Sequence, residues 1–482
     1  MKKFIFPALF AFLFVFASCL NMSGSSGESG SVRVVLPGSA RYSFSQDKAD
    51  KFVVTISLGS KLVDTKTEFS GGVIEFDELN PGEYIIEAKA FDSNEGDLVV
   101  GWGTASATVN AGESTECTLA LALTKCISTF DSVPSSSKYK YLAVASSADM
   151  TKLAEWVKAG SDFEGITITL VDDVDLADCA DDWQPIGFVK SITDDYAESN
   201  NMPFKGTFNG NGKTISYNIT KREDGLGSQM FGLFFDNYGT IENLVVNQTY
   251  SGDLSDRGMS RGGMICTYNY GNIKNCIVKS DIAIGTRSDT AGICKVNTES
   301  GKIVNCFATG SIEMQLHAGW KGSYQKTAGI CAINYGTVEN AVSSVQIKTK
   351  YVTEESTQLN NISGAIAART DGYLKNCYWL KDNIDRGGTT VNQIAYINKE
   401  TGAYTDEICI PDPSRITGCG YFETNSPSAS VVAGTTSECK SAQTLSYSGA
   451  LLEMLNAYVS ASSDSGLKKW KTGADGSLAL DF

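Results

Sequence analysis

The residues best suited to chemistry in this sequence are thirteen cysteines and a single histidine, His317. Metal sites built on two or more histidines are excluded, because only one is present. A nucleophilic site of the Ser-His-Asp or Cys-His type would have to use His317, which lies in the polar stretch 314–320 with no nucleophile motif beside it. We therefore expect an exposed loop histidine and no catalytic residue.

Clustered carboxylates are the second candidate for chemistry. Residues 172–182 carry six aspartates, and oxygen ligands of this type suit calcium. The run lacks the ligand spacing and the central glycine of an EF-hand loop, so we expect a solvated turn. The sequence thus predicts no metal site and no cofactor.

The elements that would position any site are dominated by a repeat, Gly-x-aliphatic-x-Asn, which occurs five times. Its copies run from Gly239 to Asn243, Gly271 to Asn275, Gly301 to Asn305, Gly336 to Asn340 and Gly372 to Asn376. Each copy follows a Gly-apolar-apolar stretch, and these begin at Gly232, Gly263, Gly292, Gly329 and Gly364. A period of this length is typical of a solenoid.

The residues between the repeated glycines favour strands over helices. Short runs rich in Ile, Val, Thr, Tyr and Phe alternate with Gly, Asn, Asp and Ser, and long runs of helix formers are missing. We therefore predict an all-β protein with a parallel β-helix over residues 221–400, and coils beginning near residue 165. About seven coils at about 4.8 Å each would give a rod on the order of 35 Å long.

Each fixed position of the repeat has an expected structural role. The glycine is expected to turn the chain through positive φ, and the aliphatic residue to point into the core. The asparagine is expected to bond to its equivalent in the next coil. Because all coils share these positions, we assign them to packing and not to ligand binding.

The repeat resembles the GLUG repeat of bacterial surface proteins, and the flanking segments agree with this resemblance. Residues 183–187 (Trp-Gln-Pro-Ile-Gly) and 204–215 resemble the lead-in to such repeats, and residues 470–482 resemble their closing strand. Coil length varies here, and the second glycine of the stricter pattern is absent. The resemblance implies a cell-surface scaffold and no particular reaction.

The cysteines follow the repeat. Cys276, Cys306 and Cys377 each come directly after a repeated asparagine, and Cys294 and Cys331 stand two residues after a repeated glycine. Stacked cysteines would lie within bridging range, and twelve cysteines besides Cys19 would suit disulfides in an exported protein. We expect reduced core thiols, because Leu244 and Ala341 hold the equivalent place in other coils. Cys409 and Cys419 are the pair best suited to a bridge.

The N-terminal sequence predicts an export signal with a lipid anchor. Lys2 and Lys3 precede an apolar stretch of fourteen residues, 4–17, which is too short to span a bilayer. It ends in Phe16-Ala-Ser-Cys19, which resembles a bacterial lipobox, although leucine is usual where Phe16 stands. We expect residues 1–19 to be a lipoprotein signal peptide with Cys19 as the lipidated residue. An ordinary signal peptide is the alternative.

The remaining chain divides by composition. Residues 20–30 predict a flexible tether, and 31–125 a small β-sandwich that resembles immunoglobulin-like or prealbumin-like domains at the turn 79–84. We expect a linker over 126–148 and an N-terminal cap with the first coils over 149–220, including a helix over 149–159. Residues 401–482 are expected to form a C-terminal cap, with a helix over 450–459.

The net charge limits the kinds of partner that the protein can bind. The net charge of −15 argues against binding nucleic acid, or anionic lipid by charge. We expect an exported, lipid-anchored, non-catalytic protein that binds a glycan or protein at the cell surface. The loops 249–260 and 313–326, with Tyr250, Trp320 and Tyr324, are the expected binding surface. A polysaccharide lyase or hydrolase and a purely structural envelope protein are the alternatives.

Overall fold

The structure is a computed structural model that describes residues 29–36, 51–59, 61–69, 72–92, 98–119, 122–123, 125–134, 141–177, 183–188, 202–219, 228–230, 232–250, 259–284, 289–316, 325–351, 361–386, 390–391, 413–435 and 442–482. The chain divides into two compact units. The smaller comes from the N-terminal part and includes Phe52–Ala88 and Gly103–Ala120, and the larger includes Leu121–Phe482.

The N-terminal part forms two β-sheets of order β4-β1-β7 and β3-β2-β5-β6-β8. Its strands are β1 (Gly30–Val35), β2 (Lys51–Leu58), β3 (Lys61–Glu68), β4 (Val73–Leu79), β5 (Gly82–Asp92), β6 (Leu98–Val109), β7 (Ser114–Thr118) and β8 (Ala122–Leu123). Buried and more exposed residues alternate along β1 and β2, so each sheet has one inward face. The buried Tyr84 donates its hydroxyl to the Asn80 carbonyl at 2.9 Å and so closes the predicted turn. Whether this unit is immunoglobulin-like stays a prediction.

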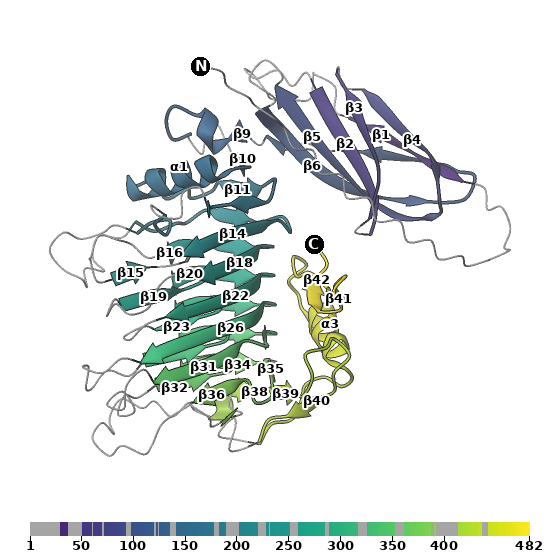
Figure 1. The fold of residues 1–482 in the computed structure, drawn as a ribbon. Coiled ribbons are helices and arrows are strands. Elements are labelled where there is room, and N and C mark those ends of the chain that lie inside the picture. Colours follow the sequence, from purple (N-terminus) through teal and green to yellow (C-terminus); the bar gives the residue numbers. More distant parts are fainter. Residues whose placement is uncertain are drawn as a thin grey trace, which may run out of the picture. The chain divides into compact units, whose positions relative to one another are not determined.

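The larger unit is a parallel β-helix, as predicted (Figure 1). One wall is a ten-stranded sheet in which neighbouring strands run parallel. In order along the stack its strands are β9 (Lys125–Cys126), β10 (Tyr141–Val144), β11 (Thr167–Leu170), β13 (Thr207–Asn209), β17 (Thr240–Glu242), β21 (Asn272–Lys274), β25 (Lys302–Val304), β29 (Thr337–Glu339), β34 (Tyr373–Lys375) and β38 (Ile416–Thr417). Ten strands exceed the expected seven coils, because β9 and β10 precede residue 165 and β38 follows residue 400.

A twelve-stranded sheet forms the second wall. Its strands are β12 (Val174–Asp175), β14 (Thr214–Ile219), β18 (Val245–Tyr250), β22 (Ile277–Ile284), β26 (Phe307–Leu316), β30 (Val342–Ser343), β31 (Gln346–Tyr351), β35 (Tyr378–Leu380), β36 (Ile384–Arg386), β37 (Thr390–Val391), β39 (Gly420–Phe422) and β40 (Val431–Ala433). Only β37 and β40 pair antiparallel with their neighbours in this sheet.

Two five-stranded parallel sheets complete the coils. The first contains β15 (Ser228–Met230), β19 (Met259–Gly263), β23 (Thr290–Ala291), β27 (Gln325–Ala328) and β32 (Asn361–Gly364). The second contains β16 (Phe234–Asn237), β20 (Cys266–Asn269), β24 (Cys294–Asn297), β28 (Cys331–Asn334) and β33 (Ala367–Thr370). A full coil therefore visits all four sheets before the next coil begins.

The prediction of a linker over residues 126–148 is wrong. Strand β10 lies inside it and pairs with β9 and β11, while Leu142 and Val144 are fully buried in the main core. A short 3-10 helix, η2 (Ile127–Thr129), also falls there. The predicted helix is confirmed as α1 (Ser147–Lys158), which buries Met150, Leu153 and Val157 against the first coils.

The repeat's asparagine, and not its glycine, makes the turn through positive φ, which corrects the role expected for the glycine. The five asparagines hold the positive φ angles, between 49° and 57°, and the five glycines do not. The glycines are required because a side chain at these positions would collide with the backbone of the neighbouring coil. A Cβ on Gly271 would stand 2.0 Å from the Gly239 carbonyl oxygen, and a Cβ on Gly372 2.1 Å from that of Gly336. The glycines therefore permit close stacking of coils, and asparagine, which tolerates the left-handed region, makes the turn.

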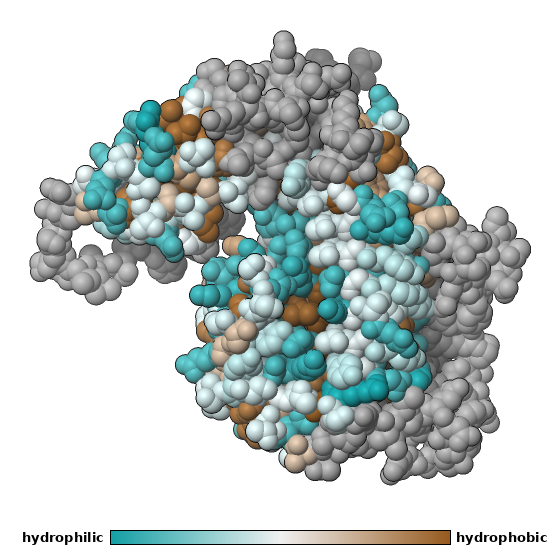
Figure 2. Space-filling model, turned by 180° about the vertical axis from the view of Figure 1, so that it is seen from behind, coloured by the Kyte–Doolittle hydropathy of each residue, from teal (hydrophilic) through white to brown (hydrophobic). Residues whose placement is uncertain are grey.

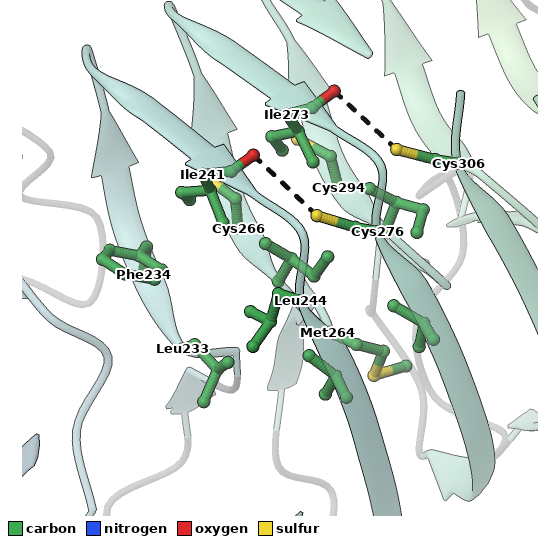
Figure 3. Close-up of a cluster of buried hydrophobic side chains, with 14 of the residues drawn as sticks. Leu233, Phe234, Ile241, Leu244, Met264, Cys266, Ile273, Cys276, Cys294 and Cys306 are labelled. Atoms are coloured by element: carbon green, nitrogen blue, oxygen red, sulfur yellow. Dashed lines mark hydrogen bonds between the residues drawn. The ribbon is translucent and has the colours of Figure 1, made fainter. Parts of the chain in front are cut away.

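The inward-facing rows form the core (Figure 3). The aliphatic residue of each repeat is fully buried, and the five are in register on successive strands: Ile241, Ile273, Ile303, Val338 and Leu374. Cys266, Cys294 and Cys331 form a second register row beside them. The nine described cysteines are free and buried, which confirms the reduced core thiols.

The expected pairing of Cys409 with Cys419 is not supported. Cys419 is a fully buried free thiol that donates to the Leu374 carbonyl, one coil below. Cys377 makes the equivalent bond to Val338. Cys419 therefore belongs to the core row that follows the repeated asparagine, where its side chain points inward. Cys409 lies outside the described residues.

The C-terminal cap was also expected in the wrong place. Residues 442–482, which we call the C-terminal segment, contain α3 (Leu451–Ala461), β41 (Trp470–Thr472) and β42 (Leu478–Leu480). The segment lies along the side of the coils (yellow in Figure 1). Its apolar face covers an outward-facing register row of the twelve-stranded sheet, namely Ile277, Phe307, Val342 and Tyr378. The helical pattern predicted a buried face but not the surface that would bury it.

Candidate ligand-binding groove

The asparagines of the repeat form a hydrogen-bonded ladder along one edge of the ten-stranded sheet. Each Nδ2 donates to the Oδ1 of the preceding coil, with distances of 2.9 Å from Asn275 to Asn243, 2.8 Å from Asn305 to Asn275 and 2.7 Å from Asn340 to Asn305. Asn209 extends the ladder below Asn243. The predicted asparagine ladder is therefore confirmed over these coils, and it fixes the ends of the strands.

A second ladder lies at the other edge of the same strands, and sequence reasoning missed it. Asn237, Asn269 and Asn297 donate upward to the next coil at 2.8 to 2.9 Å, and Asn334 donates to Thr370 at 3.0 Å. The sequence does contain its signal, since an asparagine precedes four of the five repeat glycines by two or four residues, and Thr370 takes that place before Gly372. The two ladders hold both edges of the sheet, so its outer face is rigidly spaced.

The outer face of the ten-stranded sheet carries the side chains of the two variable positions of the repeat. One register row holds Thr240, Asn272, Lys302, Thr337 and Tyr373, and the other holds Glu242, Lys274, Val304, Glu339 and Lys375. Successive strands place each row on one line, with about 4.8 Å between residues. Repeat analysis passed over these positions because they vary, yet they are the exposed side chains of a constant scaffold.

The C-terminal segment makes a wall beside this face and turns it into a groove of about 490 Å³, which we call the lateral groove. Its lining residues are Asn272, Ile273, Lys274, Lys302, Val304, Glu339, Tyr447, Tyr458, Ala461, Ser462, Ser463, Asp464 and Leu467. The wall is fixed by the asparagine ladder: Asn275 donates to Gly466 O and Asn305 to Lys468 O, both at 2.8 Å.

Ion pairs organise one part of the lateral groove. The Lys274 ammonium lies 3.3 Å from Glu242 and 3.6 Å from Asp464, so it joins the sheet to the C-terminal segment. These groups are partly exposed, and each pair contributes at most about 1 kcal/mol. Lys302 makes no ion pair with any residue that the structure describes, and it is exposed.

Two tyrosines of the C-terminal segment also line the lateral groove. The rings of Tyr447 and Tyr458 lie 6.4 Å apart and nearly perpendicular. Burial raises the pKa of the Tyr458 hydroxyl, and the negative charge and hydrogen bond of Glu339 raise it further. Tyr458 therefore stays protonated and donates to Glu339. The groove thus offers ammonium, hydroxyl and amide donors, carboxylate acceptors and aromatic rings.

Several predicted residues cannot be placed in a site. Cys19, His317, Trp320 and Tyr324 lie outside the described residues, as does most of the loops 249–260 and 313–326. Among the described residues, no group of three or more His, Cys, Asp or Glu side chains could hold a metal ion. Within the same part of the chain no helix is long and apolar enough to span a membrane.

No family model matches the sequence, and no curated protein matches it. Among solved structures the fold is similar to an IgA1 protease, with a TM-score of 0.34 and 11% sequence identity. That alignment covers 79% of this chain and 28% of the other protein.

Proposed function

We propose that this protein is an exported, lipid-anchored surface protein that binds a glycan in the lateral groove without cleaving it. The observation that carries the proposal is the groove itself. Its volume of about 490 Å³ lies within the usual range for ligand sites, and rigid elements line it on both sides. The asparagine ladder holds the floor and the wall together, so the site is formed before a ligand arrives.

The chemistry of the lining favours a sugar over an apolar ligand. Asn272, Lys302, Glu339 and Tyr458 provide donors and acceptors of the kind that hydroxyl groups need. Tyr447 adds an aromatic ring of the type that combines an apolar face with a polar tip. Figure 2 shows the molecule from behind, where pale and teal residues predominate over brown ones on the coloured part of the coil stack.

Anchoring remains the part of the proposal carried by sequence alone. Cys19 would be acylated after signal cleavage, and residues 20–30 would separate the folded units from the membrane. Replacing Cys19→Ser should release the chain from the membrane fraction and abolish incorporation of labelled fatty acid. Membrane retention with unchanged labelling would contradict this part of the proposal.

The binding function is tested with a glycan and host-protein array, using the soluble chain from residue 31 to 482. Saturable glycan binding that falls in an Asn272→Ala, Tyr458→Phe double variant supports the proposal. The bound polysaccharides are also analysed for new reducing or unsaturated ends. Product release would show an enzyme, selective protein binding would show a protein adhesin, and absence of binding would leave a structural envelope role; each result contradicts the proposal.

A further inference from the structure

We propose that the ligand of this face is a linear acidic polysaccharide that lies along the coil axis, with its anionic groups on Lys302, Lys375 and Arg415. This inference rests on the proposed glycan-binding function and names its substrate class. Lys302 lines the lateral groove, and Lys375 and Arg415 lie beyond its lining, toward the C-terminal coils.

The register places Lys302 and Arg415 on one line, and Lys375 in the neighbouring row beside Tyr373. Lys302, Thr337 and Tyr373 are successive partners in the ten-stranded sheet. Arg415 directly precedes Ile416, which pairs with Leu374, so Arg415 continues the row after Tyr373. At about 4.8 Å a coil, Lys302 and Arg415 stand roughly 14 Å apart. Such a row presents one contact per coil, and a linear polymer of similar repeat can meet each contact in turn.

The three cations on and beside this row are not balanced by ion pairs. Lys302, Lys375 and Arg415 make no salt bridge with a carboxylate in the part of the chain that the structure describes, although the whole chain carries a net charge of −15. Two of these cations share one ring. The Lys375 ammonium lies 5.3 Å and the Arg415 guanidinium 5.6 Å from the Tyr373 ring centroid. Cation–π contacts of this kind restrict the side chains while leaving donors for an anion.

The other end of the face is aromatic. Tyr238 and Tyr270 stack with ring centroids 4.2 Å apart and planes at 11°, and Tyr238 is 48% exposed. Each precedes its row neighbour, Thr240 or Asn272, by two residues. The stacked pair offers a flat platform for the apolar face of a sugar ring. From Tyr238 to Arg415 the face crosses five coil steps, roughly 24 Å.

A nucleic acid is the competing linear polyanion. It carries one phosphate per roughly 3.4 Å of each strand, so three cations on an acidic protein neutralise only a small part of its charge. An acidic polysaccharide carries fewer charges and many hydroxyls, which match the amide and tyrosine groups between the cations. The observations therefore favour the polysaccharide.

The test is titration calorimetry of the soluble chain from residue 31 to 482 with short polyuronate chains, sulfated oligosaccharides of equal length, their neutral parent and oligo(dT). A Lys302→Gln, Arg415→Gln double variant is compared with Lys350→Gln, which removes an exposed cation from β31 in another sheet. We expect the double variant to weaken acidic-chain binding about tenfold or more, because charge-assisted hydrogen bonds are lost. Lys350→Gln should leave binding unchanged, and added salt should weaken wild-type binding.

The outcomes separate the two proposals. Preference for polyuronate or for sulfated chains over the neutral parent, lost in the double variant, supports the inference and identifies the anion. Equal binding of the neutral parent, or acidic binding that survives in the double variant, overturns the inference but keeps glycan binding. Tight oligo(dT) binding overturns the polysaccharide class, and absence of all glycan binding overturns both proposals. Unchanged urea midpoints would show that the variants remain folded.

Discussion

The indole Nε1 of Trp470 donates a 2.6 Å hydrogen bond to Oδ1 of Asn305, across 165 positions of sequence. The same asparagine oxygen accepts from Asn340, while its amide donates to Asn275 and to Lys468 O. The ladder of the repeat therefore also binds the C-terminal segment. Since that segment forms one wall of the lateral groove, the repeat and the groove depend on the same buried amides.

Asn305 should be among the most sensitive positions of the repeat. An Asn305→Ala variant leaves its buried partners unsatisfied, at about 1–3 kcal/mol each, and strains a residue with φ of 57°. We expect a loss of about 3–5 kcal/mol in the free energy of urea unfolding. Asn305→Gly should lose about 1 kcal/mol less, because glycine tolerates this φ. Equal losses in the two variants would show that the backbone angle is unimportant.

Removal of the Trp470 side chain should loosen the C-terminal segment without unfolding the coils. Trp470→Ala empties a buried site, and changes of this kind cost about 3–5 kcal/mol. Hydrogen exchange should accelerate in residues 442–482 while β21 and β25 keep their protection. The control is Lys471→Ala, whose exposed pair with Asp481 contributes little. Uniform acceleration across all coils would contradict a locally docked segment.

The repeat glycines should not tolerate a methyl group. In Gly271→Ala the new Cβ would meet the Gly239 carbonyl oxygen at 2.0 Å, and neither backbone can move without breaking the coil spacing. We expect at least about 4 kcal/mol of destabilisation, or no folded protein in a soluble-expression assay. In Gly473→Ala the nearest atom is a carboxylate oxygen of the exposed Asp475 side chain at 3.0 Å and not backbone, so this control should lose less than about 1 kcal/mol. Similar stability of the two variants would refute the close-stacking role.

Stability should fall in alkaline solution because of the buried thiols. Burial raises the pKa of the Cys294 and Cys331 thiols well above the ordinary value of 9.0. Above pH 9 the unfolded chain releases these protons and the folded chain keeps them, so the free energy of unfolding decreases as the pH rises. Each such thiol contributes a slope of at most about 1.4 kcal/mol per pH unit.

Urea titrations between pH 8 and 11 would measure this slope. Other groups titrate in the same range, so the readout is the difference between wild type and a Cys294→Ala variant. The variant should have the shallower slope, whatever its stability at pH 8. Parallel curves for the two proteins would mean that the Cys294 thiol is not protected in the folded state.

The sequence predicts the coil architecture well because the repeat fixes register. A constant Gly-x-aliphatic-x-Asn unit can stack only with its aliphatic residues inward and its asparagines aligned, as Ile273 and Asn275 show. The same reasoning misassigned the backbone angles, since a glycine in a repeat has two physical explanations. Gly271 is needed for a close approach, which depends on the neighbouring coil and is invisible in the sequence.

The lateral groove could not be predicted for a related reason. Its floor lies at the variable positions, such as Asn272 and Lys302, which carry no periodic signal. Its wall comes from Tyr447 to Leu467, whose amphipathic helix predicts a buried face but not its partner. Packing of two segments nearly 200 residues apart decides this site, and local pattern does not report it.

The most direct test of glycan binding in the lateral groove is hydrogen exchange of the protein with and without a bound oligosaccharide. We predict added protection in β21, β25, β29 and residues 447–467, with β31 and the N-terminal unit unchanged. Protection confined to the connections between β18 and β19 or between β26 and β27, with the groove strands unaffected, would contradict the account.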